Sequence, residues 1–209
     1  MNLLTIADRL LGPGGCPWDR EQTLLTLQTY LLEEAHELIE AIDSNDPKKI
    51  VEELGDVLFT LVFIGKLGQK ENLFTFEEAE KLECEKLIRR HPHIFANEKV
   101  DSVDEVLRNW EKIKKDERAD KGRETILDGI PPTLPMLARA QKIILKLRRA
   151  KSSLVSKKTE QKLSENEIAQ RLWEIVAEAE SSDVDAESAL RRFCQQIEEK
   201  HRRLTRDKN

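Results

Sequence analysis

The chain has 209 residues, of which 39% are hydrophobic, 36% charged and only 5% aromatic. This length and apolar content suffice for one or two modest hydrophobic cores, which excludes a wholly disordered protein. A formal net charge of -5 gives no global attraction to nucleic acid. No apolar run approaches the roughly 20 residues of a membrane span, and the N-terminus lacks the basic and apolar segments of a secretion signal.

Composition also bears on fold class and location. Alternating runs of β-branched and aromatic residues are missing, so we expect an all-α fold. The three cysteines are widely spaced and match no metal-binding pattern. Such an odd set suits reduced thiols, and we expect a cytoplasmic protein without a membrane partner.

The first half of the chain predicts four helices. Glycine and proline in residues 12–17 indicate an extended lead-in to the first of them. Apolar residues at helical spacing predict helices over 22–42 and 47–70. The stripes expected to form the core side of this pair are Leu24, Leu27, Leu31, Leu38 and Ile42, then Leu54, Val57, Leu58, Leu61 and Ile64. Thr75-x-x-Glu78 and Ser102-x-x-Glu105 have the pattern of capping boxes, which predicts helices over 76–90 and 103–118.

The second half predicts three more helices. Pro131, Pro132 and Pro135 punctuate the chain before a helix over 136–150. Ser164-x-x-Glu167 begins a helix that reaches about residue 180, and another covers 185–206. Residues 142–162 hold eight Lys or Arg and one acid. This segment could contact an anionic partner, but a solvated helix end and linker explains it better, since few aromatic residues interleave the charges.

Two acidic clusters are the most informative feature. They are Glu33-Glu34-x-x-Glu37 and Glu53-x-x-Asp56. Between them, Asp46 suits a helix N-cap and Pro47 a first helical position. If the two helices form an antiparallel hairpin about Asn45, Glu37 and Glu53 are each eight residues from the turn, and Glu34 and Asp56 are each eleven. Four carboxylates then face one another in two layers.

Facing carboxylates repel one another, so the arrangement predicts a bound cation. An all-oxygen set favours Mg²⁺, with Mn²⁺ second, over Zn²⁺. Magnesium commonly accepts phosphate oxygens, and the site therefore predicts a phosphorylated ligand. The alternative is an ordinary exposed acidic helix face.

Six motifs in order resemble one known family. They are Gly15-Cys-Pro-Trp-Asp19, Glu33-Glu34-x-x-Glu37, Glu52-Glu-Leu-Gly-Asp-Val-Leu-Phe59, Arg89-Arg-His-Pro-His-Ile-Phe95, Trp110-Glu-Lys-Ile-Lys114 and Ala138-Arg-Ala-Gln-Lys142. Over residues 1 to about 148 the chain is similar to the MazG family of nucleoside triphosphate pyrophosphohydrolases. The resemblance implies an all-α, Mg²⁺-dependent, typically dimeric enzyme that cleaves nucleoside triphosphates (NTP or dNTP) between the α- and β-phosphates.

The acidic residues take roles from this resemblance. It implies that Glu34, Glu37, Glu53 and Asp56 are the Mg²⁺ ligands. Glu33 is expected to orient or deprotonate the attacking water, because that role needs a carboxylate beside the metal that the metal does not fully neutralise.

The substrate-binding residues are expected on two later helices. Lys86, Arg89 and Arg90 lie within one turn and suit a phosphate grip, although they also suit an ordinary basic helix end. Trp110 and Lys114 resemble the family's Trp-x-x-x-Lys, where the indole would stack on a base and the ammonium would meet a phosphate. Trp110 could equally anchor a core or an interface.

The C-terminal part is expected to be a decayed repeat of the first module. Aligning residues 173–179 with 32–38 matches Glu174 to Glu33 and Glu178 to Glu37, but too few residues follow to hold a second Glu-x-x-Asp helix. We therefore expect a catalytic module over 1–120, a connecting helix and basic linker over 121–160, and a truncated, degenerate module over 161–209. The leading interpretation is a house-cleaning pyrophosphohydrolase. The alternatives are a nucleotide-binding regulatory or scaffolding protein with little turnover, and a nucleic-acid-binding module.

Overall fold

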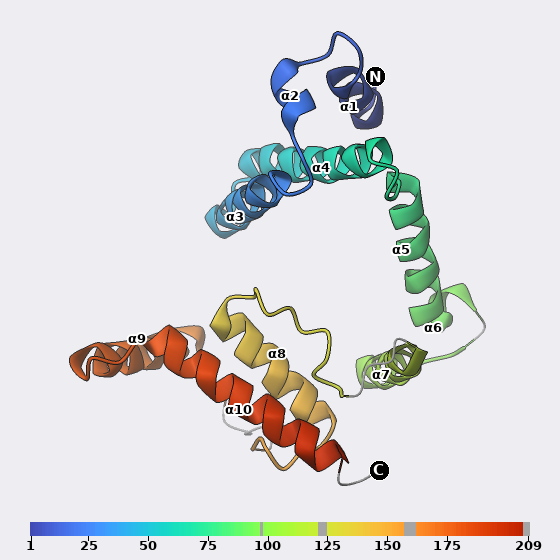
Figure 1. Cartoon of the computed structure of the whole chain (residues 1–209). Coiled ribbons are helices and arrows are strands. Elements are labelled where there is room, and N and C mark those ends of the chain that lie inside the picture. Colours follow the sequence, from blue (N-terminus) through green and yellow to red (C-terminus); the bar gives the residue numbers. More distant parts are fainter. Residues whose placement is uncertain (97, 121–124, 157–161, 207–209) are drawn as a thin grey trace. The chain divides into compact units, whose positions relative to one another are not determined.

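The computed structural model describes residues 1–96, 98–120, 125–156 and 162–206, and every regular element in these ranges is a helix (Figure 1). The predicted all-α fold is confirmed. The chain divides into two compact units, Met1–Trp110 and Glu111–Asn209. The predicted domain limits after residues 120 and 160 adjoin or fall within segments outside the described residues, so the three-part division stays a prediction. Within the described ranges, no helix combines the length and apolar character needed to cross a bilayer.

The centre of the first unit is the hairpin of α3 (Leu27–Ser44) and α4 (Pro47–Lys70). Asn45 links them in the left-handed conformation, with φ 56° and ψ 30°, which asparagine tolerates better than most residues. The Asp46 side chain accepts a hydrogen bond from the Lys48 N–H at 3.0 Å, and Pro47 is the first helical residue. The predicted hairpin and its cap are confirmed.

Two short helices that were not predicted from the sequence precede the hairpin. They are α1 (Leu3–Leu11), capped by the Asn2 side chain, and α2 (Pro17–Glu21). The expected helix over 22–42 begins only at Leu27. The Thr23 and Thr26 hydroxyls each accept a hydrogen bond from the other residue's backbone N–H, and such local bonds compete with helix formation.

The core of this unit lies between α1 and the second half of α4. Its buried members are Ala7, Leu27, Val62, Phe63 and Leu67. Several residues expected in the core are instead exposed: Ile42, Leu54, Leu58 and Leu61 have 55%, 46%, 46% and 42% of their surface accessible. The prediction of their burial was wrong. A two-helix hairpin buries only the stripe where its helices touch, and these residues form an additional stripe beside it.

The rest of the first unit follows α4. The capping box at Thr75 and Glu78 begins α5 (Phe76–Arg90), as predicted, and Pro92 begins the short α6 (Pro92–Phe95). Helix α7 (Val103–Asp120) starts where the Ser102 hydroxyl accepts a hydrogen bond from the Glu105 N–H, and it crosses the division between the units.

The second unit is built on α8 (Met136–Arg149), α9 (Glu165–Ser181) and α10 (Ala186–Arg206). The predicted capping box of Ser164 and Glu167 is present. The core of the second unit contains Leu127, Ile130, Met136, Ile143, Leu147 and Cys194, so α8 packs against α10. Arg139 on α8 forms a largely buried ion pair with Glu198 on α10 at 2.6 Å, which fixes the register of these two helices.

Candidate metal centre

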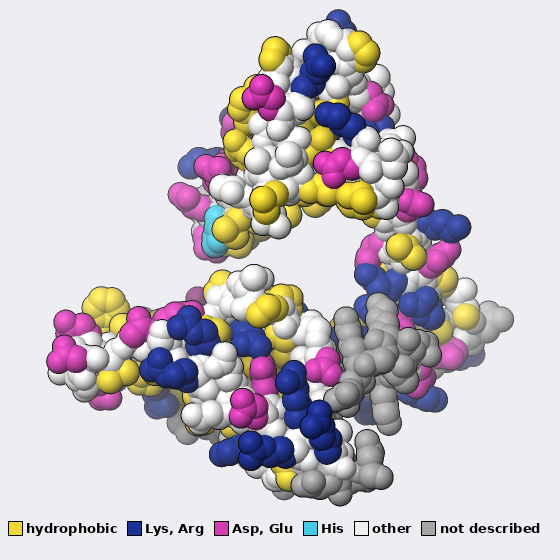
Figure 2. All heavy atoms as spheres, viewed as in Figure 1, with side chains coloured by type: hydrophobic (Ala, Val, Ile, Leu, Met, Phe, Trp, Pro, Cys, Tyr) yellow, Lys and Arg dark blue, Asp and Glu magenta, His cyan; other side chains and the backbone are white. Residues whose placement is uncertain are grey.

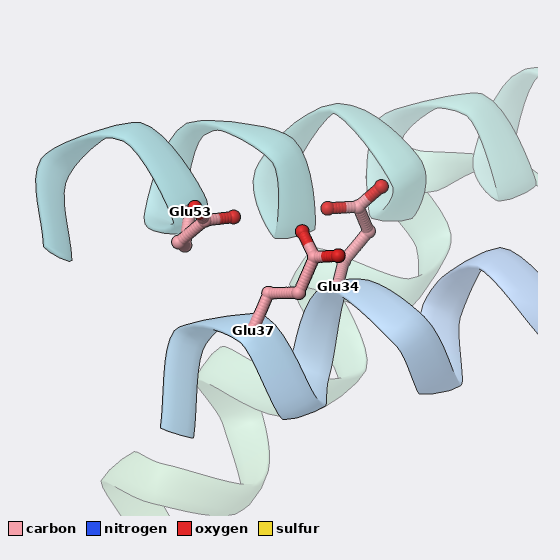
Figure 3. Close-up of side chains that lie close together, drawn as sticks. All are labelled: Glu34, Glu37 and Glu53. Atoms are coloured by element: carbon pink, nitrogen blue, oxygen red, sulfur yellow. The ribbon is translucent and has the colours of Figure 1, made fainter. Parts of the chain in front are cut away.

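Three carboxylates converge in the α3–α4 hairpin. Glu34 and Glu37 come from α3 and Glu53 from α4, and each offers one oxygen that lies within 4.8 Å of the others (Figure 3). The i,i+3 spacing puts the first two on one face of α3. The turn at Asn45 determines which residue of α4 faces them. The predicted pairing of Glu37 with Glu53 across the hairpin is confirmed.

Several negative charges lie close together in this cluster. The pKa of Glu34 is raised, chiefly by partial burial and then by the charges of Asp56, Glu37 and Glu33. The pKa of Glu53 is also raised, by desolvation, by the charge of Glu37 and by a hydrogen bond to it. In both residues the charges of the neighbouring carboxylates add to the effect of desolvation.

Asp56 and Glu33 lie beside the cluster rather than among its three close oxygens. Each still raises the pKa of Glu34, so both contribute to the negative field. Glu52, which was not among the predicted site residues, raises the pKa of Glu53 in the same way. Its signal in the sequence was its position next to Glu53. Six carboxylates thus act on one small region of the hairpin.

The donor set fits a hard divalent cation. It consists of carboxylate oxygens supplied by two rigid helices, without the thiolate or imidazole that would favour zinc or copper. The cation would remove the repulsion that raises the two pKa values, because it favours the ionised form of its ligands. The Glu34, Glu37 and Glu53 side chains would hold it, with Asp56 one turn further along α4.

Of the predicted substrate-binding residues, Lys86, Arg89, Arg90 and Trp110 lie at the other end of the first unit, whereas Lys114 follows the division between the units on α7. Lys86 is paired with Glu83 on the preceding turn of α5. The Arg90 guanidinium carbon lies 5.9 Å from the centre of the Trp110 ring, within the range of a cation–π contact. Lys114 is half-buried one turn further along α7. The structure thus pairs Arg90 with Trp110 and gives the indole a cationic neighbour.

The acidic cluster and the cations of α5 are far apart within one copy of the chain. Glu53 lies about 25 Å along α4 from the end of that helix. Arg89 lies about 20 Å along α5, which leaves α4 at a steep angle instead of folding back along it (Figure 1). One triphosphate cannot span this separation. The sequence grouped these residues into one site, and a single copy does not bring them together.

Known proteins resemble the part of the chain that contains the acidic cluster. Residues 22–95 match the family model described as the MazG nucleotide pyrophosphohydrolase domain. A nucleoside triphosphate pyrophosphohydrolase of Escherichia coli is 48% identical over 142 residues, which are 68% of this chain and 54% of that protein. The chain thus spans about half the length of this relative.

Two proteins of Thermotoga maritima are also similar. A nucleoside triphosphate pyrophosphohydrolase/pyrophosphatase MazG is 35% identical over 219 residues, covering 97% of this chain and 84% of that protein. A crystal structure of a mazG-related protein is 33% identical, with a TM-score of 0.49, and the match covers 54% of this chain and 96% of that one. The first match extends the similarity beyond the acidic hairpin to nearly the whole chain.

Proposed function

The chain belongs to the MazG family, and we propose that it is a Mg²⁺-dependent nucleoside triphosphate pyrophosphohydrolase. The reaction adds water to an NTP or dNTP and yields the monophosphate and pyrophosphate. The convergence of Glu34, Glu37 and Glu53 is the observation that carries this proposal. We further propose a house-cleaning role in the cytoplasm with broad base tolerance, a location that suits three free cysteines.

The acidic residues have two different roles in the proposed reaction. Glu34, Glu37, Glu53 and Asp56 would hold the metal. When bound, Mg²⁺ would offset charge at the α-phosphoryl group and the leaving pyrophosphate and would make water easier to ionise. Glu33 sits at the margin of the cluster, where its carboxylate can orient the attacking water and accept its proton. Catalysis is then mainly positional and electrostatic.

We propose that the phosphate grip comes from a second copy of the chain. Lys86, Arg89 and Arg90 are too far from the cluster in their own copy, so a partner's α5 must supply them. The hairpin has an apolar face suited to such a dimer, made of Leu32, Ile39, Ile42, Val51, Leu54, Leu58 and Leu61, all at least 42% exposed. Figure 2 shows hydrophobic side chains along the surface of this unit. In the dimer, Trp110 holds Arg90 toward the phosphates, and Lys114 adds a further charge.

Product analysis tests the enzymatic proposal. The purified chain should convert nucleoside triphosphates to monophosphate and pyrophosphate only with Mg²⁺. Glu37→Ala should lower kcat by about 10²-fold or more, the equivalent of several kcal/mol of lost transition-state stabilisation. Glu40→Ala, one turn along α3 and exposed, is the matched control and should retain activity. Mg²⁺-dependent binding without turnover would instead identify a nucleotide-binding regulatory protein, and release of diphosphate and phosphate would contradict the proposed cleavage.

Mixing two inactive variants tests the shared site. Glu37→Ala lacks a cluster ligand and Arg89→Ala lacks a grip residue, so a mixed dimer would contain one intact site. An equal mixture that exchanges subunits freely should regain about a quarter of wild-type activity. If the mixture stays as inactive as its components, the cluster and the grip do not come from different copies.

A further inference from the structure

The exposed indole of Trp18 lies beside the helix that carries two of the cluster's carboxylates. It meets the ring of Tyr30 on α3 edge to face, with 5.7 Å between the ring centres. Tyr30 packs against the core of the first unit, whereas 54% of the Trp18 surface stays accessible. The contact therefore fixes the indole and leaves much of its flat apolar surface open to a ligand.

The position of Tyr30 brings this indole close to the acidic cluster. Tyr30 precedes Glu34 by four residues and Glu37 by seven, so all three lie on one face of α3. Figure 3 shows the two carboxylates on that face. Four helical residues rise about 6 Å, and in a nucleotide the sugar separates the base from the α-phosphate by a comparable length. A nucleotide whose α-phosphate lies at the cluster can therefore place its base on Trp18 of the same copy.

Hydrogen bonds from both hairpin helices hold the short helix of Trp18 in place. The Gln22 side chain donates to the Trp18 carbonyl at 3.1 Å and accepts from the hydroxyl of Thr26, the residue before α3, at 2.8 Å. The ammonium of Lys70, the last residue of α4, donates to the Arg20 carbonyl at 3.4 Å. A ring that is already held in place loses little conformational entropy when a ligand binds to it.

The other two tryptophans of the chain are placed differently. Trp110 has the Arg90 guanidinium over its ring, and the two lie at the end of the first unit that is distant from the cluster. Trp173 belongs to the second unit. Phe59 and Phe63 pack against each other at the core. Trp18 is thus the tryptophan that the first unit presents beside its own carboxylates.

We propose that Trp18 is the base-stacking residue of the nucleotide site and that Tyr30 is a positioning residue for its indole. This inference rests on the proposed pyrophosphohydrolase function. The base contact that the family resemblance gave to Trp110 then passes to Trp18, and Trp110 acts on the phosphates through Arg90. Every nucleobase has a π-face, so stacking on an indole tolerates different bases. The site therefore takes a flat aromatic base of any kind, which agrees with the broad base tolerance proposed above.

Binding of two probes to the full chain, measured by calorimetry with Mg²⁺, tests the proposal. The α,β-methylene analogue of ATP has a base but lacks the bridging oxygen at which the proposed cleavage occurs, and inorganic tripolyphosphate has no base. Trp18→Ala should weaken binding of the analogue by about fivefold or more. Tripolyphosphate should bind to this variant as it does to wild type. Trp18→Tyr keeps a ring and should retain most of the affinity for the analogue.

Two control variants separate base stacking from other effects. Trp173→Ala removes another exposed indole and should change neither affinity. Trp110→Ala should weaken both probes alike, because it acts through Arg90. The proposal is overturned if Trp18→Ala leaves binding of the analogue unchanged, or if it weakens both probes equally, as a loss of structure would.

The wild-type protein distinguishes failure of this inference from failure of the proposed function. Equal affinity of wild type for the two probes would mean that the base adds nothing, which overturns the role of Trp18 and leaves the pyrophosphohydrolase proposal standing. Binding of neither probe would overturn both. Loss of the analogue's advantage in Trp110→Ala and not in Trp18→Ala would place the base on Trp110 instead.

Discussion

Glu37 on α3 and Glu53 on α4 each place a carboxylate oxygen within 4.8 Å of the other across the hairpin, although both are acids. Desolvation raises the pKa of Glu53, and the charge of Glu37 raises it further. A bound cation would offset this repulsion. The proposed metal binding of the hairpin can therefore be tested through its folding stability, without any assay of turnover.

The Glu53→Gln variant should distinguish the effect of carboxylate repulsion on stability from the effect of metal binding. In a chelator, the neutral amide relieves repulsion, so the variant should unfold at a higher temperature than wild type. With Mg²⁺ at about 100 times its dissociation constant, wild type should gain ~2.7 kcal/mol of unfolding free energy, and the variant should gain little. Thermal unfolding of both proteins with chelator and with Mg²⁺ measures this. An equal Mg²⁺ response in the two proteins would remove Glu53 from the ligand set.

The difference in stability between wild type and Glu53→Gln should depend on pH. Because the folded-state pKa values of Glu34 and Glu53 are raised, the metal-free fold binds protons more tightly than the unfolded chain does. The resulting stability is fully present below the ordinary carboxyl pKa and is lost as pH rises through the raised values. Denaturant titrations in chelator should show the deficit of wild type relative to Glu53→Gln shrinking as pH falls below neutrality. A gap that is constant with pH would contradict the raised pKa of Glu53.

Asp46→Ala should weaken the hairpin without removing its ligands. Loss of the side-chain bond to the Lys48 N–H should cost about 1 kcal/mol, seen as a lower unfolding temperature. Asp43→Ala is the matched control: this exposed acid lies in the last turn of α3, where negative charge is unfavourable to the helix dipole. Its removal should leave stability equal or slightly higher. A loss of stability in Asp43→Ala that matches Asp46→Ala would argue against a capping role.

Trp110→Ala should weaken substrate binding through Arg90. The cation–π contact is worth roughly 0.5–1 kcal/mol at an exposed site, so KM for a nucleoside triphosphate should rise about two- to fivefold. Trp110→Phe retains a ring and should show a smaller increase. Steady-state kinetics with circular dichroism as a folding control measures this. A fall in kcat with unchanged KM would mean that Trp110 does not act on binding.

The cysteines should differ in reactivity. Cys84 is exposed, whereas Cys194 is 5% exposed and burial raises its thiol pKa. A thiolate-directed disulfide reagent at mildly alkaline pH should modify Cys84 rapidly and Cys194 only upon unfolding. Cys84→Ser identifies the fast phase, because that phase should vanish in the variant. Rapid modification of Cys194 in the folded protein would show that the α8–α10 core opens easily.

Local sequence signals predicted the hairpin well. Asn45, Asp46 and Pro47 stop one helix and begin the next within three residues, and each acts on the adjacent backbone. The capping boxes at Thr75 and Ser164 were reliable for the same reason. Because the turn and the helical repeat together determine which residues face each other, the pairing of Glu37 with Glu53 was also predictable from spacing alone.

Tertiary packing was harder to predict from the sequence. Periodicity identified Leu54 and Leu58 as apolar, but only the packing of α1 and α4 shows that other residues of α4 form the core. Helix α1 has only nine residues, which is too short a stretch for hydrophobic periodicity to identify a helix. The distance of Arg89 from the acidic cluster depends on the direction in which α5 leaves α4, which no local pattern encodes.

Because the left-handed turn at Asn45 fixes how α3 and α4 face each other, the acidic cluster depends on the number of residues between Glu37 and Glu53. One residue inserted between Glu37 and Asn45 would rotate the preceding turns of α3 by about 100° and carry Glu34 and Glu37 away from Glu53. The surrounding apolar residues would lose comparatively little contact, since much of this stretch is exposed. Apart from buried Ala41 and the turn residues Asn45, Asp46 and Pro47, residues 38–52 can therefore vary in identity far more readily than in number. A single-residue insertion there would give a folded protein with a dismantled centre.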